Sequence, residues 1–296
     1  VVWSDVPARP RVMGRTAPAP YSHATFLDDA TSRLFTVSEH GTGSVVDLQT
    51  MQPISQWRVP TYWPSSITAC DKLVAVGCMN GDVWITDLAQ QYTTKSRGDG
   101  SQILEVARLP GGAFLTLSEL GSLREIRASL ESRHVADLGT CGTSSHRASN
   151  RLMVDRGRAH VLVGSDEILV ATVNLATGEM HRAISRYQLE SMLGRPSDPI
   201  VALAVAADGH RYFLAEANKA IHSISFNALA DSEPTLDWSH TGVAAAALLG
   251  LEDFSRILAF SRSGDLTSLD FDGNRVFSMP TVDGPIVFAG VRGDGS

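Results

Sequence analysis

Residues 65–88, SSITACDKLVAVGCMNGDVWITDL, predict three short β-strands joined by two tight turns. The first strand is expected at 65–70, and the second, at 73–78, is continuously apolar. The third, at 83–88, alternates apolar and polar residues and closes on a Thr-Asp pair. An Asn-Gly pair at 80–81, between two apolar runs, is a strong short signal for a β-hairpin, because both residue types tolerate a positive φ. The stretch therefore predicts an antiparallel meander.

The end of the third strand recurs along the chain as an alternating run that closes on a polar or charged residue. The seven copies end at Asp5, Asp47, Asp87, Arg127, Asn174, Asn227 and Asp270. The steps between them are 42, 40, 40, 47, 53 and 43 residues. A period of about 40–45 residues is typical of a four-stranded propeller blade. The sequence therefore predicts an all-β fold, a seven-bladed β-propeller of four-stranded antiparallel blades.

The other strands of the unit also recur, with a gradient from apolar inner strands to more polar outer strands, as radial packing requires. First strands are expected at 24–27, 65–70, 104–108, 151–154, 201–205, 243–249 and 286–291. Second strands are expected at 33–37, 73–76, 113–117, 160–163, 212–215 and 257–260. Polar outer strands are expected, for example, at 54–59, 133–138, 180–184 and 275–279.

The closing blade is expected to be shared between the N- and C-terminal segments. It would take its inner strand from 286–291 and its two outer strands from 1–16, which removes the open edges of the sheets. Its second strand is missing from the pattern, and we expect it to lie outside the sequence given. Because the sequence starts with Val rather than Met, we interpret residues 1–296 as a single propeller domain of a longer chain.

Two connections between blades are long, at 140–149 and 187–198. In the second, four apolar or aromatic side chains recur at helical spacing: Tyr187, Leu189, Met192 and Leu193. A glycine and a proline follow at 194 and 196 as stop signals, so a short helix is expected there.

Composition argues against several classes of function. The net charge of −7 argues against a general nucleic-acid binder, because that affinity depends on clustered Lys and Arg. The longest apolar run, at 243–251, is far shorter than the ~18 residues that span a bilayer, and no signal segment opens the sequence. Cys70, Cys78 and Cys141 form neither a CxxC pair nor an even framework. This usage indicates a reducing, intracellular location, cytoplasmic or nuclear.

No catalytic or cofactor motif emerges from the sequence. There is no GxSxG, and the glycines stand singly in hairpin turns rather than in a phosphate-binding loop. A metal in a propeller channel would need several ligands at the starts of the inner strands. The corresponding positions are His23, Ser65, Leu104, Asn150, Asp198 and Gly242, which make a poor set. We therefore expect no metal, no cofactor and no enzymatic activity.

Protein partners are the expectation that remains, contacted through the loops that enter the inner strands and the turns between second and third strands. Aromatic, Met and Arg side chains in such loops offer large contact areas. The candidates are Tyr62, Trp63, Arg147, Tyr187, Met192, Arg195 and Arg262. Alternatives remain: Trp63 covers the gap between blades, the stripe at 187–193 packs on its own domain, and the arginines are solvated.

The repeat at 65–88 resembles one repeat of the WD-repeat β-propeller family, with a Thr-Asp pair where the family usually has Trp-Asp. Similar but weaker matches are at 1–5, 44–48 and 266–270. The Gly-His pair at the head of the repeats is missing, so the Asp-His-Ser/Thr-Trp hydrogen-bond network of many members is not expected to be general here.

The resemblance implies a non-enzymatic scaffold that holds other proteins, as a domain or subunit of a larger multiprotein assembly. One alternative is a reader of peptides or modified residues at the channel mouth. A less favoured alternative is a propeller hydrolase that would use Asn150 and Asp198.

Overall fold

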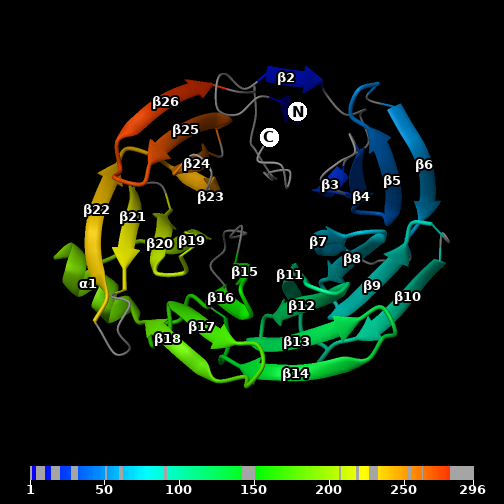
Figure 1. Ribbon diagram of the computed structural model, residues 1–296, viewed down its shortest axis with the longest axis horizontal. Coiled ribbons are helices and arrows are strands. Elements are labelled where there is room, and N and C mark those ends of the chain that lie inside the picture. Colours follow the sequence, from blue (N-terminus) through cyan, green and yellow to red (C-terminus); the bar gives the residue numbers. More distant parts are fainter. Residues whose placement is uncertain are drawn as a thin grey trace. The chain divides into compact units, whose positions relative to one another are not determined.

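The computed structural model describes residues 2–4, 11–14, 21–27, 33–50, 52–59, 63–89, 92–141, 151–206, 208–217, 220–226, 233–251, 255–261 and 263–280. This part of the chain contains 26 strands and one helix (Figure 1). The strands form six four-stranded antiparallel sheets and one two-stranded sheet. In each four-stranded sheet the strands follow one another in chain order, as the meander predicted from residues 65–88 requires.

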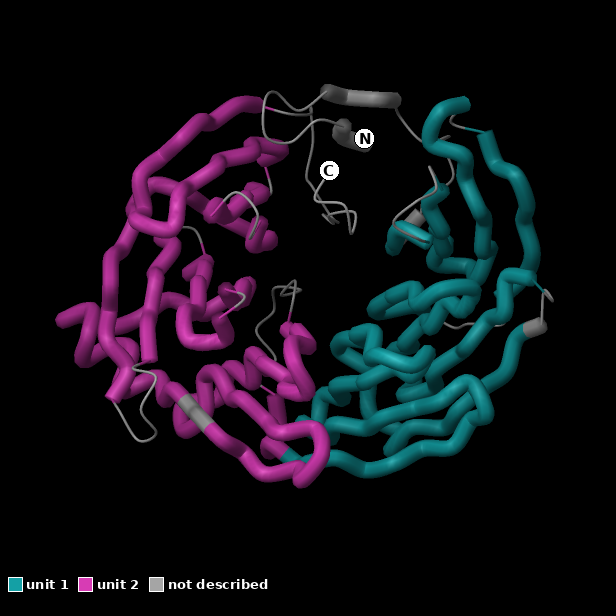
Figure 2. The backbone as a smooth tube through the Cα atoms, in the orientation of Figure 1, with its two compact units in different colours: residues 1–137, 290–296 teal, residues 138–289 magenta. Residues whose placement is uncertain are grey.

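The chain divides into two compact units, Val1–Asp137 with Gly290–Ser296, and Leu138–Ala289 (Figure 2). Unit 1 begins with the antiparallel pair β1 (Val2–Ser4) and β2 (Arg11–Gly14). Its first four-stranded sheet is β3 (Tyr21–Phe26), β4 (Arg33–Ser38), β5 (Thr42–Asp47) and β6 (Gln52–Arg58). The second is β7 (Pro64–Cys70), β8 (Leu73–Cys78), β9 (Asp82–Asp87) and β10 (Tyr92–Arg97). The third is β11 (Ile103–Leu109), β12 (Ala113–Ser118), β13 (Ser122–Arg127) and β14 (Ser132–Asp137).

Unit 2 holds the other three four-stranded sheets. The first is β15 (Leu152–Asp155), β16 (Arg158–Leu162), β17 (Val170–Asn174) and β18 (Met180–Ile184). The second is β19 (Ile200–Val205), β20 (Arg211–Glu216), β21 (Ala220–Ser225) and β22 (Thr235–Thr241). The third is β23 (Ala245–Leu251), β24 (Arg256–Ser261), β25 (Asp265–Asp270) and β26 (Arg275–Pro280). The first and second strands predicted for these ranges overlap the observed strands, and so do the predicted outer strands.

The predicted short helix is confirmed as α1 (Arg186–Leu193) in unit 2. Ser185 caps its N-terminus in a capping box with Gln188, which satisfies backbone N–H groups that have no partner inside the helix. Gly194 ends the helix in the left-handed conformation, with φ of 65°. Leu189 is buried, whereas Met192 and Leu193 pack partly buried against the same apolar cluster.

The turns between second and third strands have a different geometry from the one expected for an Asn-Gly pair. Gly81 adopts φ of 83°, but Asn80 does not have a positive φ. The Gly81 N–H donates to the carbonyl of Cys78 at 3.1 Å. Three other turn glycines, all with positive φ, likewise donate their N–H to the carbonyl of the residue three positions earlier: Gly41, Gly121 and Gly264. Only the last residue of each turn therefore needs to be Gly, as in hairpin loops that end in a residue with positive φ.

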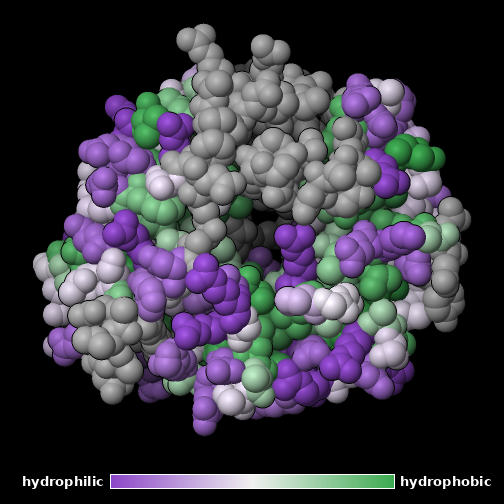
Figure 3. Space-filling view, in the orientation of Figure 1, coloured by the Kyte–Doolittle hydropathy of each residue, from purple (hydrophilic) through white to green (hydrophobic). Residues whose placement is uncertain are grey.

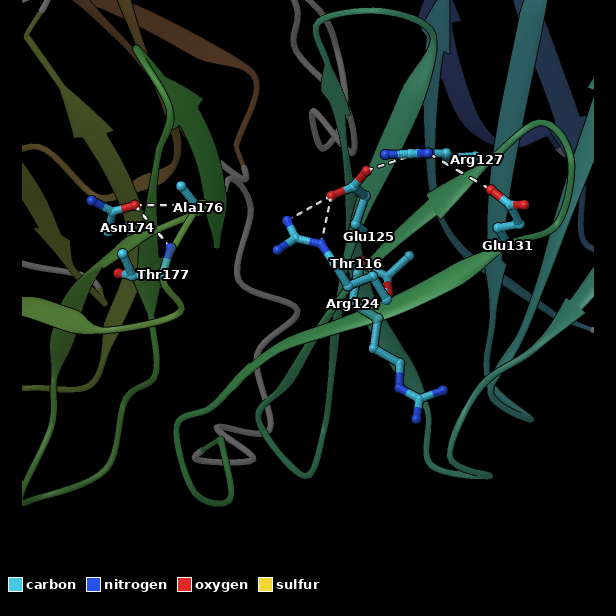
Figure 4. A network of polar contacts seen from close by, with 9 residues as sticks. Thr116, Arg124, Glu125, Arg127, Glu131, Asn174, Ala176 and Thr177 are labelled. Carbon is cyan, nitrogen blue, oxygen red and sulfur yellow. Dashed lines mark hydrogen bonds and ion pairs between the residues drawn. The ribbon is translucent and has the colours of Figure 1, made fainter.

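The polar residue that closes the third strands has a physical role. One carboxylate or amide oxygen accepts backbone N–H bonds from the turn that follows, as in an Asx turn. The acceptors are Asp47, Asp87, Asn174 and Asp270. Figure 4 shows the arrangement at Asn174, whose Oδ1 accepts from the N–H of Ala176 at 2.9 Å. The repeated signal in the sequence is therefore a turn cap.

The copy that ends at Arg127 replaces this cap with ion pairs. Arg127 Nε lies 3.2 Å from one oxygen of Glu125, and Arg127 Nη1 lies 3.7 Å from Glu131 (Figure 4). Arg133 binds the other oxygen of Glu125 at 2.7 Å, and its hydrogen bonds hold the pKa of Glu125 below the usual range. The end expected at Asn227 lies outside the described residues; β21 is described up to Ser225.

The cores lie where neighbouring sheets of one unit face each other. In unit 1, β7 lies against both β3 and β11. Phe35 and Val37 of one sheet and Val74 and Val76 of the next are fully buried in one cluster. In unit 2, β19 lies against β23, and the buried alanines and aliphatic residues of these strands form a second cluster. Burial of apolar surface between sheets is the main stabilising term for such stacks.

Of the closing blade expected from the sequence, the structure describes only two strands. The antiparallel pair β1–β2 agrees with the two strands expected from 1–16. The inner strand expected at 286–291 lies outside the described residues, as does most of the connection at 140–149. The described part of the chain thus contains six complete four-stranded sheets.

Candidate protein-interaction site

Trp63 occupies the loop that enters β7 of unit 1, and its backbone has an unusual conformation. Its φ is 57°, a region that bulky residues seldom adopt because the side chain meets the backbone. Its carbonyl accepts a hydrogen bond from the N–H of Met79 at 3.1 Å, which ties the loop to the β8–β9 turn. The side chain is 53% exposed. A strained residue that the surrounding structure holds in place is a reason to look for function.

Two more apolar side chains are exposed in turns of unit 1. Met79 lies in the β8–β9 turn and is 43% exposed, and Leu120 lies in the β12–β13 turn and is 54% exposed. Neither residue was a candidate in the sequence analysis, although each stands one or two positions before a turn glycine, where polar residues are usual. We call Trp63, Met79 and Leu120 the turn cluster.

The turn cluster lies at one end of two neighbouring sheets. The starts of β7 and β11 are side by side: the Ser65 hydroxyl donates a hydrogen bond to the carbonyl of Ile103 at 2.5 Å. The segment 98–102 lies between the two turns. The N–H of Gly98 donates to the carbonyl of Gly81 at 3.1 Å, and the N–H of Glu119 donates to the carbonyl of Gln102 at 2.8 Å. Backbone hydrogen bonds therefore connect all three parts of the cluster.

The candidates on α1 of unit 2 differ in exposure. Tyr187 is 79% exposed, the highest value among the large apolar or aromatic side chains of the described residues. Met192 packs partly buried against the cluster that includes Leu189 and Tyr212. The stripe predicted at 187–193 therefore packs on its own unit, except for Tyr187.

Arg195 belongs to a buried polar group in unit 2. Its Nη2 and Nη1 donate to the two carboxylate oxygens of Glu216 at 2.7 and 3.1 Å, and the Glu216 side chain is 0% exposed. His222 is also fully buried, with Nε2 at 3.3 Å from Glu216 Oε2 and Nδ1 at 2.8 Å from the Ser239 hydroxyl oxygen. The N–H of Asp198 donates to Glu216 at 3.1 Å. Arg195 was predicted from the sequence, whereas Glu216 was not.

The charges of this group follow from its contacts. Burial raises the pKa of Glu216, but the hydrogen bonds from Arg195, the nearby His222 and the N–H of Asp198 outweigh it and lower the pKa overall. Burial lowers the pKa of His222, and the neighbouring Glu216 opposes this shift only in part. Glu216 is therefore ionised and His222 neutral near neutral pH, and Arg195 serves to neutralise a buried carboxylate.

Three of the predicted contact residues, Tyr62, Arg147 and Arg262, lie outside the described residues. Among the residues that the structure describes, no three His, Cys, Asp or Glu side chains are grouped closely enough to hold a metal ion. No helix in the described ranges is both long and apolar enough to cross a membrane. On the face seen in Figure 3, hydrophobic residues form separate small areas among hydrophilic ones.

Comparison with solved structures defines the class of fold. The chain is similar to the Myceliophteria thermophila Cps50 (Swd1) β-propeller domain, with a TM-score of 0.65 and 12% identity over 89% of this chain and 87% of that one. It is also similar to the computationally designed Ika8 protein, with a TM-score of 0.64 and 12% identity over 90% of this chain and 76% of that one. The fold is a β-propeller with blades of four antiparallel strands.

The likeness at 12% identity concerns the fold alone. No protein-family model matches the chain, and no curated protein matches its sequence.

Proposed function

We propose that this chain is a WD-repeat-like β-propeller that acts as a non-enzymatic protein-interaction scaffold, with the turn cluster as its partner contact. The observation that carries the proposal is Trp63, which combines a strained backbone, at φ of 57°, with a side chain that is 53% exposed. An exposed tryptophan gains little stability for its own fold, whereas it offers a large, rigid contact area to a partner.

The test is partner capture by the full chain with matched variants. Trp63→Ala and Leu120→Ser each remove an exposed side chain from the turn cluster. Ile54→Ser on β6 is the control, because it removes an aliphatic side chain of nearly equal exposure outside the turn cluster: Ile54 is 56% exposed and Leu120 is 54% exposed. We expect both cluster variants to lose the same captured proteins, by about tenfold or more, and the control to retain them.

Thermal unfolding of each variant separates loss of binding from loss of folding. A set of captured proteins that is unchanged in both cluster variants, with all chains folded, would contradict the proposal.

We further propose an intracellular location and membership of a larger assembly. The three cysteines, Cys70, Cys78 and Cys141, form neither a CxxC pair nor an even framework, which supports a reducing compartment. The net charge of −7 supports protein rather than nucleic-acid partners.

A further inference from the structure

The backbone beneath the turn cluster is held in one arrangement. Gly81 packs so closely on the neighbouring segment that a Cβ added there would lie 2.7 Å from the carbonyl oxygen of Ser101. The hydroxyl of Ser118 on β12 donates to Asp99 at 2.8 Å, which fixes the same segment to the next sheet. A surface that is ordered before binding loses less conformational entropy when a partner docks.

Carboxylates stand next to the apolar side chains of the cluster. Asp99 lies in the segment between the two turns, and Glu119 directly precedes Leu120. Burial raises the pKa of Asp99, but hydrogen bonds from Ser101 and Ser118 outweigh it and lower the pKa overall, so this side chain is charged at neutral pH.

Two cations at the same end of the sheet lie on its outer strand, and a third, Arg124 of β13, is close enough to Asp99 to help lower its pKa. Lys95 of β10 is bound to Asp82 at 3.2 Å and lies over the Trp84 ring at 5.4 Å from the ring centroid, so its charge is already matched. Arg97 ends β10 opposite Asp82 and is exposed. Asp99 and Glu119 are therefore the carboxylates next to the apolar side chains of the cluster, and Arg124 matches part of the charge of Asp99.

We propose that the turn cluster binds a segment of a partner protein in which an apolar side chain is flanked by Lys or Arg. The inference rests on the proposed function and specifies the chemistry of the partner. The apolar side chain contacts Trp63, Met79 and Leu120, and the basic neighbours face Asp99 and Glu119. Such charge pairs set the choice of partner and speed association more than they add affinity.

Selection from a random peptide library tests the inference. The library is selected against the full chain and, in parallel, against a Trp63→Ala, Leu120→Ser double variant. We expect the peptides enriched only on the unchanged chain to carry an apolar residue beside Lys or Arg. Cluster-dependent peptides without excess basic residues would overturn this inference and leave the proposed function standing. The absence of any cluster-dependent peptide would overturn the proposed function as well.

Charge variants then measure the contribution of each carboxylate to binding of one selected peptide. Asp99→Asn and Glu119→Gln remove charge with little change in shape, and Asp71→Asn in the β7–β8 turn, at the other end of the sheet, is the control with the same change in net charge. We expect about threefold weaker binding for each of the first two variants and about tenfold for the pair, with a smaller salt dependence. Equal weakening by the control, or none by either variant, would overturn the inference.

Discussion

The carboxylate of Glu216 is completely buried and is held by the guanidinium of Arg195, whose Nη2 lies 2.7 Å from Oε2. The two residues come from different elements of unit 2, since Glu216 ends β20 and Arg195 lies in the loop between α1 and β19. An ionised carboxylate inside a protein is costly without a partner. The ion pair therefore ties this loop to the end of β20.

Loss of Arg195 is expected to destabilise the protein. Breaking a buried pair typically costs about 3–5 kcal/mol, but the Arg195 side chain is 38% exposed and water screens part of the interaction, so we expect about 2 kcal/mol for Arg195→Ala. Arg186→Ala is the control, because its partner Asp166 is 89% exposed and a surface pair contributes less than about 1 kcal/mol. Urea unfolding of both variants measures the difference, and equal losses would contradict this account.

Acid is expected to destabilise the protein through the same group. The pKa of Glu216 is lowered in the folded state, so its contribution to stability is present above the unfolded pKa and is lost as pH falls through the folded pKa. The pKa of His222 is lowered as well, so the unfolded state takes up a proton first as pH drops below about 6.5. The free energy of unfolding should therefore fall as pH falls from about 7 to about 4.

Urea unfolding at a series of pH values measures this dependence. His222→Gln should flatten the part just below about pH 6.5, and Glu216→Gln should flatten the more acidic part. A pH dependence that neither variant changes would show that other groups are responsible.

Gly81 is expected to be sensitive to substitution for two separable reasons. Its φ of 83° is unfavourable for alanine, and the added Cβ would lie 2.7 Å from the Ser101 carbonyl oxygen. Gly111 has a similar φ of 79° but no atom within 4 Å of the added Cβ, so it isolates the first reason. We expect losses of about 1 kcal/mol for Gly111→Ala and about 2–3 kcal/mol for Gly81→Ala, measured by denaturant unfolding. Equal losses would show that the neighbouring segment moves aside.

The turn cap at Asp270 is expected to stabilise the folded protein through its hydrogen-bond acceptor oxygens rather than through its charge alone. Its carboxylate accepts from the N–H of Asp272 at 3.0 Å and from the N–H of Asn274 at 2.7 Å. Asp270→Ala should lower the free energy of unfolding by about 1 kcal/mol, whereas Asp270→Asn keeps an acceptor and should lose less than half of that. A larger loss for the Asn variant would indicate that charge dominates.

The repeat pattern allowed the sheets to be predicted because their signals are local. An alternating strand, a turn glycine and a capping Asp or Asn each act within a few residues, as at 80–87, and they recur in phase. The sixth copy was predicted to end at Asn227, which lies outside the described residues; the last residue of β21 is Ser225, and the N–H of Phe226 still donates to the carbonyl of His210 at 2.8 Å.

The candidate site was less predictable because it depends on contacts between distant residues. Glu216 and Arg195 are 21 residues apart, and the Tyr212 hydroxyl meets Thr172, 40 positions away, at 2.6 Å. No local pattern marks such pairs. Exposure at Met79 and Leu120 is likewise a property of the folded turns, although an apolar residue close to a turn glycine is a signal that sequence reasoning could use.

Trp63 offers a last prediction, because its backbone conformation and its side chain can be tested separately. Trp63→Ala and Trp63→Gly both remove the indole, but alanine keeps a Cβ at φ of 57°, whereas glycine adopts this region without strain. We expect the glycine variant to be more stable than the alanine variant by about 1 kcal/mol, the reverse of the usual order. Both should lose the partner equally, since the contact surface is gone in each. If alanine were the more stable, the loop would not be strained at this position, and the structural reason for assigning function to Trp63 would be lost.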